Sequence, residues 1–178
     1  MQIKEALDQK LFPDRQSDTT YTFQAGGYDY TLVFQGTDYP INATIQMLSS
    51  VLSPEDKKEF DAVITKEKNR LTGKCAFIQF SAHKNGRDTI EVLGDSNPFA
   101  VFDYICNGVK DYYDRHQQNV SLWYFGGVAS EPKRERVYSL LAKRMNLMYG
   151  GEYKTLTLKR SRSPAGEAGT WFFPYKYS

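Results

Sequence analysis

The sequence predicts an α/β (α+β) fold, in which a mixed central β-sheet carries helices on both faces. Two segments, 75–80 and 120–125, are apolar on both alternating sides, as interior strands covered on two faces are. A segment with the apolar periodicity of an amphipathic helix follows each of them. From residue 75 onward the order is strand, strand, helix, strand, helix, strand, strand, which implies parallel pairing across two helical crossovers.

Composition favours one domain over residues 1–178, with an N-terminal part at 1–73 and a second part at 74–178. The 178 residues are 40% hydrophobic and 25% charged, which excludes a disordered or coiled-coil chain. No apolar run approaches the roughly 20 residues of a membrane span, and the first residues hold no apolar signal core. We therefore expect a cytoplasmic protein without membrane contact. The two cysteines and two histidines cannot form a Cys/His zinc site of ordinary spacing, so we expect no metal.

The N-terminal part contains a predicted helix, a hairpin and a charged helix. Residues 2–10 have the apolar spacing of a short helix that Pro13 ends. Alternating aromatic and β-branched residues at 21–24 and 28–35 flank a Gly-Gly pair, which predicts an antiparallel hairpin. Residues 40–53 fit either strand or helix. Ser53-Pro-Glu-Asp56 is typical of a helix start, and the periodicity extends that helix to about Arg70, with Gly73 beyond its end.

The second part begins with the strand at 75–80 and a turn into a further strand at 89–93. Asn97-Pro98 begins a helix that runs to about Arg115. The strand at 120–125 is expected to end at Gly126-Gly127. A helix at 132–146 follows, with Val137, Leu140, Leu141 and Met145 facing inward. Strands are predicted at 153–158 and 170–175, joined by a flexible basic loop at 159–169.

Positive charge is concentrated in the C-terminal third of the chain. Residues 131–162 hold nine basic and three acidic residues, a net charge of +6, whereas the remainder carries −4. Such segregation favours either an anionic partner or a solvated helix face. The candidate partner-binding residues are Lys133, Arg134, Arg136, Lys159, Arg160 and Arg162.

The order of elements resembles the fold of the GNAT (N-acetyltransferase) family over roughly the last 105 residues. The segment Arg136-Val-Tyr-Ser-Leu-Leu-Ala-Lys-Arg144, followed by Tyr149-Gly150, is similar to the Leu-Tyr-x-x-x-Gly-Phe end of that family's second helix. It also resembles uncharacterised phage and plasmid proteins with a Ser-Arg-x-x-Leu-Tyr-x-x-Leu-x-Lys-Arg helix. The resemblance implies a GNAT-like sheet and a phage-encoded protein of the host cytoplasm.

The same resemblance implies an acetyl-coenzyme A site. Family members hold the pyrophosphate on an Arg/Gln-x-x-Gly-x-Gly/Ala turn before the long helix, which would assign Gly94, Ser96 and Asn97 to the cofactor here, and Tyr138 to protonation of the departing thiolate. Only Gly94 matches the turn. Asp95 adds a negative charge beside the phosphates and Pro98 removes an N–H donor, so the cradle is weakened. Helix capping by these residues, and packing by Tyr138, are the alternative interpretations.

Three functions follow from these observations. The leading hypothesis is a non-catalytic binding or regulatory module, without cofactor, whose basic C-terminal surface binds nucleic acid or an acidic host protein. The first alternative is an acetyl-CoA-dependent N-acetyltransferase. The second alternative is a structural virion component.

Overall fold

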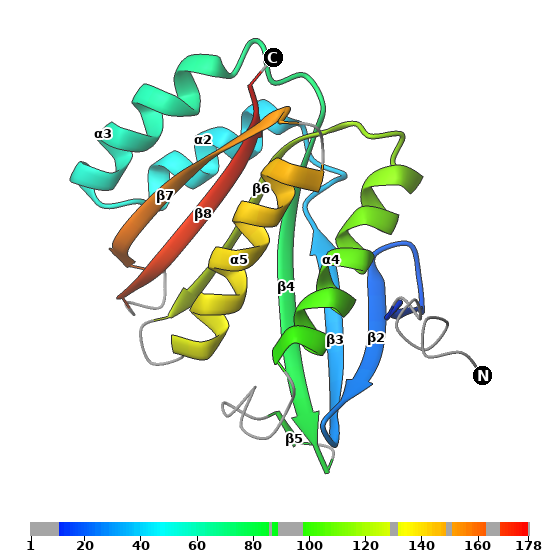
Figure 1. The fold of residues 1–178 in the computed structure, drawn as a ribbon. Helices are drawn as coiled ribbons and strands as arrows, with labels where there is room; N and C mark the ends of the chain where they lie inside the picture. The colour runs from blue at the N-terminus through cyan, green and yellow to red at the C-terminus, as the bar shows by residue number, and fades with distance from the viewer. Residues whose placement is uncertain are drawn as a thin grey trace.

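A single mixed β-sheet, covered by helices on both faces, organises the molecule (Figure 1). The computed structural model describes residues 11–85, 87–88, 98–128, 132–148, 151–162 and 168–177. The strands run in the order β1-β2-β3-β4-β6-β8-β7, and the short β5 pairs with the end of β4. Among the described strands, only β4 and β6 pair in parallel, and both are interior, as predicted. The predicted parallel pairing across the second helical crossover is wrong, because β8 lies between β6 and β7 and pairs antiparallel with both.

The predicted N-terminal hairpin is confirmed. Strand β2 (Thr20–Ala25) pairs with β3 (Tyr28–Gln35) around Gly26 and Gly27, whose φ angles of 59° and 80° suit a two-residue hairpin turn. A two-residue strand, β1 (Asp14–Arg15), borders β2. The helix predicted at 2–10 lies outside the described residues.

The segment that fitted either strand or helix is a helix, α2 (Ile41–Val51), which buries Ile41, Ile45 and Leu48. The next helix, α3 (Pro54–Val63), begins as predicted, because the Ser53 hydroxyl accepts a hydrogen bond from the Asp56 N–H. Its predicted extension to Arg70 is wrong. The chain tightens into a 3₁₀ turn, η1 (Thr65–Glu67), and bends back so that Leu71 is buried.

The central strands are longer than predicted. Strand β4 (Lys74–Lys84) reaches β5 (Arg87–Asp88), whereas the strand predicted at 89–93 lies outside the described residues. Helix α4 (Pro98–Arg115) confirms the prediction. Strand β6 (Val120–Val128) does not end at its glycines, because Gly126 continues the ladder opposite Trp171. A Cβ on Gly126 would lie 2.7 Å from the Trp171 ring, so the glycine makes room for the indole.

The C-terminal elements are α5 (Pro132–Met148), β7 (Tyr153–Arg162) and β8 (Ala168–Lys176). Leu140 was expected to face inward but is 40% exposed, whereas Leu141 is fully buried. The predicted basic loop at 159–169 is largely wrong. Both strands continue through it, since Lys159 pairs with Thr170 and Arg162 with Ala168, and only 163–167 lie outside the described residues.

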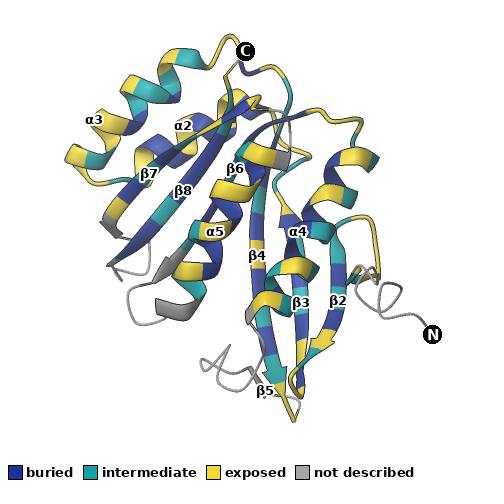
Figure 2. Cartoon of the chain, viewed as in Figure 1, coloured by how far each residue is buried: buried dark blue, intermediate teal, exposed yellow. Residues whose placement is uncertain are grey.

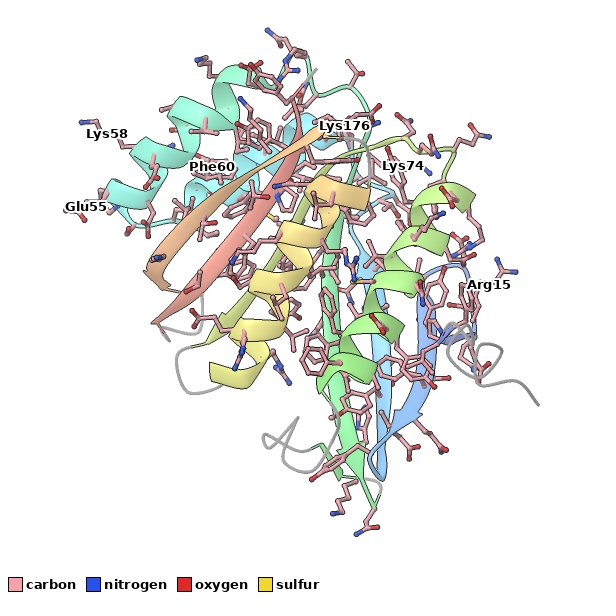
Figure 3. The ribbon with its side chains drawn as sticks, viewed as in Figure 1. Arg15, Glu55, Lys58, Phe60, Lys74 and Lys176 are labelled. Carbon is pink, nitrogen blue, oxygen red and sulfur yellow. The ribbon has the colours of Figure 1, made fainter. Side chains whose placement is uncertain are left out.

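Two hydrophobic cores lie on opposite faces of the sheet. Helices α4 and α5 share one face, as right-handed crossovers in one direction across the sheet require, and α2 and α3 cover the other. The helices in Figure 2 are buried toward the sheet and exposed outward. Figure 3 shows Phe60 of α3 on the sheet side, 5.1 Å from the Phe173 ring, while Glu55 and Lys58 point away. Cys75 and Cys106 are buried, as small hydrophobes are.

Candidate functional site

The two parallel strands separate halfway along their length. Their pairing runs from Lys74 opposite Val120 to Phe77 opposite Tyr124 and then stops, although both strands continue. Beyond that point β4 follows β3 and β6 follows β8. We call this separation the β4–β6 divergence; it is visible in Figure 1. Its open end is at the carboxyl ends of the strands, where α4 and α5 both begin.

Tyr138 of α5 lies within the β4–β6 divergence. Its ring centroid is 5.1 Å from that of Phe80 on β4 and 5.2 Å from that of Phe125 on β6. The side chain is only 2% exposed. Its hydroxyl accepts a hydrogen bond from the Phe80 N–H at 3.4 Å, so the phenol is bonded to the backbone of β4.

One turn earlier, Arg134 is half-buried and its guanidinium lies 5.4 Å from the centre of the Phe80 ring. This cation–π contact places a fixed positive charge beside the divergence. Arg136, two residues on, is exposed to solvent. Of the three predicted cations of α5, Arg134 and Arg136 are therefore described and have different surroundings; the Lys133 side chain is not described.

The β7–β8 hairpin lies beside the first turns of α5. Thr170 of β8 donates a hydrogen bond to the Glu135 carboxylate at 2.9 Å, and Thr170 pairs with Lys159 on β7. The backbone thus brings the predicted basic residues of the hairpin and of α5 to one region. Lys159 is exposed; the side chains of Arg160 and Arg162 are not described.

The predicted cofactor turn, Gly94, Ser96 and Asn97, lies outside the described residues. Helix α4 begins at Pro98, at the open end of the β4–β6 divergence. The positive end of its dipole is therefore directed toward that end of the sheet.

A second polar cluster, which the sequence did not predict, lies at the other end of α4. Arg115 donates to the Asp18 carboxylate at 2.6 Å and to the Asp111 carboxylate at 3.1 Å. The Tyr21 hydroxyl donates to Asp111 at 2.6 Å, and burial followed by this hydrogen bond raises the pKa of Tyr21 to about 12. The cluster joins β2 and the turn before it to the helix.

His116 extends this cluster to β4. Lys74 Nζ lies 3.0 Å from His116 Nδ1, and His116 Nε2 lies 3.7 Å from the Asp18 carboxylate. An ammonium only donates, so Nδ1 accepts and Nε2 carries the proton. Burial, and then the charge of Lys74, lower the pKa of His116 below its ordinary value of 6.5. Because its charges compensate one another, we assign the cluster a structural role. Only the Asp111–Arg115 spacing could have indicated it from sequence.

Within the described part of the chain, no group of three or more His, Cys, Asp or Glu side chains could hold a metal ion. No helix among the described residues has both the length and the apolar character that a membrane crossing requires.

Comparisons with known proteins identify no relative. No protein-family model matches the chain, and no curated protein or solved structure is similar enough to count as a match. The candidate site therefore depends on its geometry alone.

Proposed function

We propose that this chain is a GNAT-like protein that binds an anionic partner at the open end of the β4–β6 divergence, without acyl transfer. The observation that carries the proposal is the position of Tyr138. Its buried ring lies between Phe80 and Phe125, and its hydroxyl already accepts the Phe80 N–H. The Tyr138 side chain thus occupies the space between the strands. What this region exposes to solvent is basic side chains.

The topology supports the GNAT-like part of the proposal. A long helix, α4, connects the two parallel strands, a second helix follows β6, and a strand pair completes the sheet. This is the order that the sequence resemblance implies, and Tyr138 falls at the helix position where the resemblance places the family tyrosine.

Charge supports the binding part. Arg136 and Lys159 are exposed, Arg134 is fixed on the Phe80 ring, and both α4 and α5 direct their positive ends to this end of the sheet. The one acidic side chain of the first turn of α5, Glu135, is engaged by Thr170. A group of Lys and Arg side chains attracts the phosphates of a nucleic acid whatever its base sequence. Nucleic acid is therefore the partner that we propose.

The test replaces Lys159, Arg160 and Arg162 together by Ser. Binding of short double-stranded DNA and of single-stranded RNA is measured in a filter assay between about 50 and 200 mM salt. We expect the variant to bind more weakly, with a shallower salt dependence and an unchanged melting temperature.

The matched control replaces Lys58, Lys66 and Lys68 by Ser, which removes the same charge from exposed positions of α3 and its following segment. This control should bind as the wild type does. Equal loss in both triple variants would indicate a nonspecific effect of net charge. If neither variant nor salt changes the binding, the basic residues are solvated surface residues that take no part in binding. Capture of an acidic protein instead of nucleic acid would replace the proposed partner.

An acetyltransferase is the second candidate function, and it is favoured by the position of the Tyr138 hydroxyl. The Tyr138 hydroxyl, a possible general acid, lies 3.4 Å from a backbone N–H donor between diverging strands. We expect calorimetry to detect no saturable binding of acetyl-coenzyme A at micromolar concentration, since Asp95 and Pro98 weaken the phosphate cradle. Saturable binding that a bulky residue at Gly94 abolishes would favour the enzyme. Tyr138→Phe would then test the chemistry, since it removes the proton and keeps the ring.

A further inference from the structure

An open cavity of about 410 Å³ lies on the opposite face of the sheet from α4 and α5, between α2 and β6. Helix α2 buries Ile45 and Leu48 in the second core, so that its flank, with Thr44 and Met47, borders the cavity. Gly36 forms part of the floor. Its φ of 86° favours glycine, and even a Cβ there would approach the Tyr124 hydroxyl to 3.6 Å.

The wall of the cavity is an aromatic ring held in a fixed orientation. Tyr124 stacks on Phe77 with ring centroids 4.9 Å apart, and Phe77 stacks on Trp171 at 6.3 Å. The three rings cross the neighbouring strands β6, β4 and β8, and each is partly exposed. Tyr39, which is 70% exposed, provides a second ring at the rim. The cavity therefore has one preorganised aromatic surface and one that is free to adjust.

The lining determines which ligand chemistry fits. None of the lining residues is charged; they are Gln35, Gly36, Tyr39, Ala43, Thr44, Met47 and Tyr124. No described residue hydrogen-bonds to the Tyr124 hydroxyl, and burial raises its pKa to about 12, so it remains a donor at neutral pH. The volume is in the range of small-molecule sites, which combine apolar walls with a few polar groups.

We propose that this cavity binds an uncharged planar aromatic molecule, which stacks against Tyr124 and accepts a hydrogen bond from its hydroxyl. An anionic ligand is disfavoured because no cation lines the cavity, and burying an unpaired charge there is costly. The site is separate from the basic end of α5, so its failure and that of the proposed function are distinguishable.

The experiment titrates ¹⁵N-labelled protein with quinoline, a neutral planar ring with one acceptor nitrogen, and follows the backbone amides by NMR. We expect saturable shifts confined to residues 35–47 and to the neighbourhood of Tyr124. Tyr124→Phe keeps the ring and removes the hydroxyl. It should weaken the affinity for quinoline about fivefold, which is the contribution of one hydrogen bond. Naphthalene, which lacks the acceptor, should bind both proteins equally.

Two helix variants provide the matched pair. Ala43→Trp adds bulk to the lining and should abolish binding, whereas Gln46→Trp adds the same bulk at an exposed position of α2 that does not line the cavity. Scattered or nonsaturable shifts, or equal binding by both tryptophan variants, would overturn the proposal. If the same amides shift with protein concentration alone, a second copy covers this face and the ligand proposal is wrong.

Discussion

His116 is held neutral between Lys74 and Asp18, and this makes the fold sensitive to acid. Burial and Lys74 lower its pKa in the folded state below the ordinary 6.5. A lowered histidine pKa means that its stabilising contribution is present above pH 6.5 and is lost as the pH falls through the folded value. We expect the free energy of unfolding, measured by urea denaturation, to decrease as the pH falls below 6.5.

The control for this prediction is His116→Asn, which removes the titrating ring. The variant should be less stable than the wild type at neutral pH, because the contact of the His116 ring with the Tyr112 ring, 4.1 Å away, is lost. The stability difference between the two proteins should narrow as the pH falls. An identical pH dependence in the two proteins would assign the acid sensitivity to other groups, of which Asp18, Arg115 and Asp38 surround the ring.

Gly73 shows that a glycine after a helix can serve packing rather than helix termination. It does not have a positive φ, and a Cβ added there would lie 2.4 Å from the Ser121 hydroxyl and 2.9 Å from the Asn119 carbonyl oxygen. Gly73→Ala should therefore lower the free energy of unfolding by about 1–3 kcal/mol, because the added methyl group overpacks this site. The exposed neighbour Thr72→Ala should be within about 0.5 kcal/mol of the wild type in the same denaturation experiment.

At the scale of elements, α5 offers a direct test of which helix face is core. Leu141 is fully buried and Leu140 is 40% exposed, although they are adjacent. Leu141→Ala should lower the free energy of unfolding by about 2–5 kcal/mol, whereas Leu140→Ala should lower it far less. Similar losses in both variants, measured by chemical denaturation, would contradict the assigned helix orientation.

Local signals predicted most elements, and elements that depend on distant contacts were missed or misjudged. Gly26-Gly27 indicates its hairpin without help from the rest of the chain, and Asn97-Pro98 marks the start of α4. In contrast, β6 continues through Gly126 only because Trp171 of a later strand fills the space above it. The periodicity of the segment likewise continues past the end of α3, so it does not reveal that the chain turns into η1 before the buried Leu71.

The sequence could predict which residues belong to the candidate site, but it could not predict how they are arranged in space. Tyr138 was singled out from sequence, but its position between Phe80 and Phe125 depends on the divergence of two strands that are distant in sequence. The cavity beside Tyr124 carried no sequence signal, because its lining comes from a loop, a helix and a strand that join only in the folded protein.

At the scale of the whole molecule, both hydrophobic cores depend on the same sheet. Trp123 is buried in the core of α4 and α5, whereas Trp171 packs against the core of α2 and α3. The two single variants, Trp123→Phe and Trp171→Phe, each leave one tryptophan to report on one core. We expect the remaining fluorescence and the circular dichroism to change at the same denaturant concentration within each variant. Separate midpoints would show that the two faces unfold independently.

The position of β8 between β6 and β7 bears on how the nascent chain folds at the ribosome. Strand β7 is synthesised before β8, yet its only described strand partner is β8. Until β8 emerges, Leu156 and Leu158 of β7 have no sheet to join, and the β6 edge that β8 will cover stays open. Exposed apolar strands of this kind are what chaperones bind and what leads to aggregation. Translation speed and chaperone supply over the last two strands are therefore expected to govern the yield of folded protein.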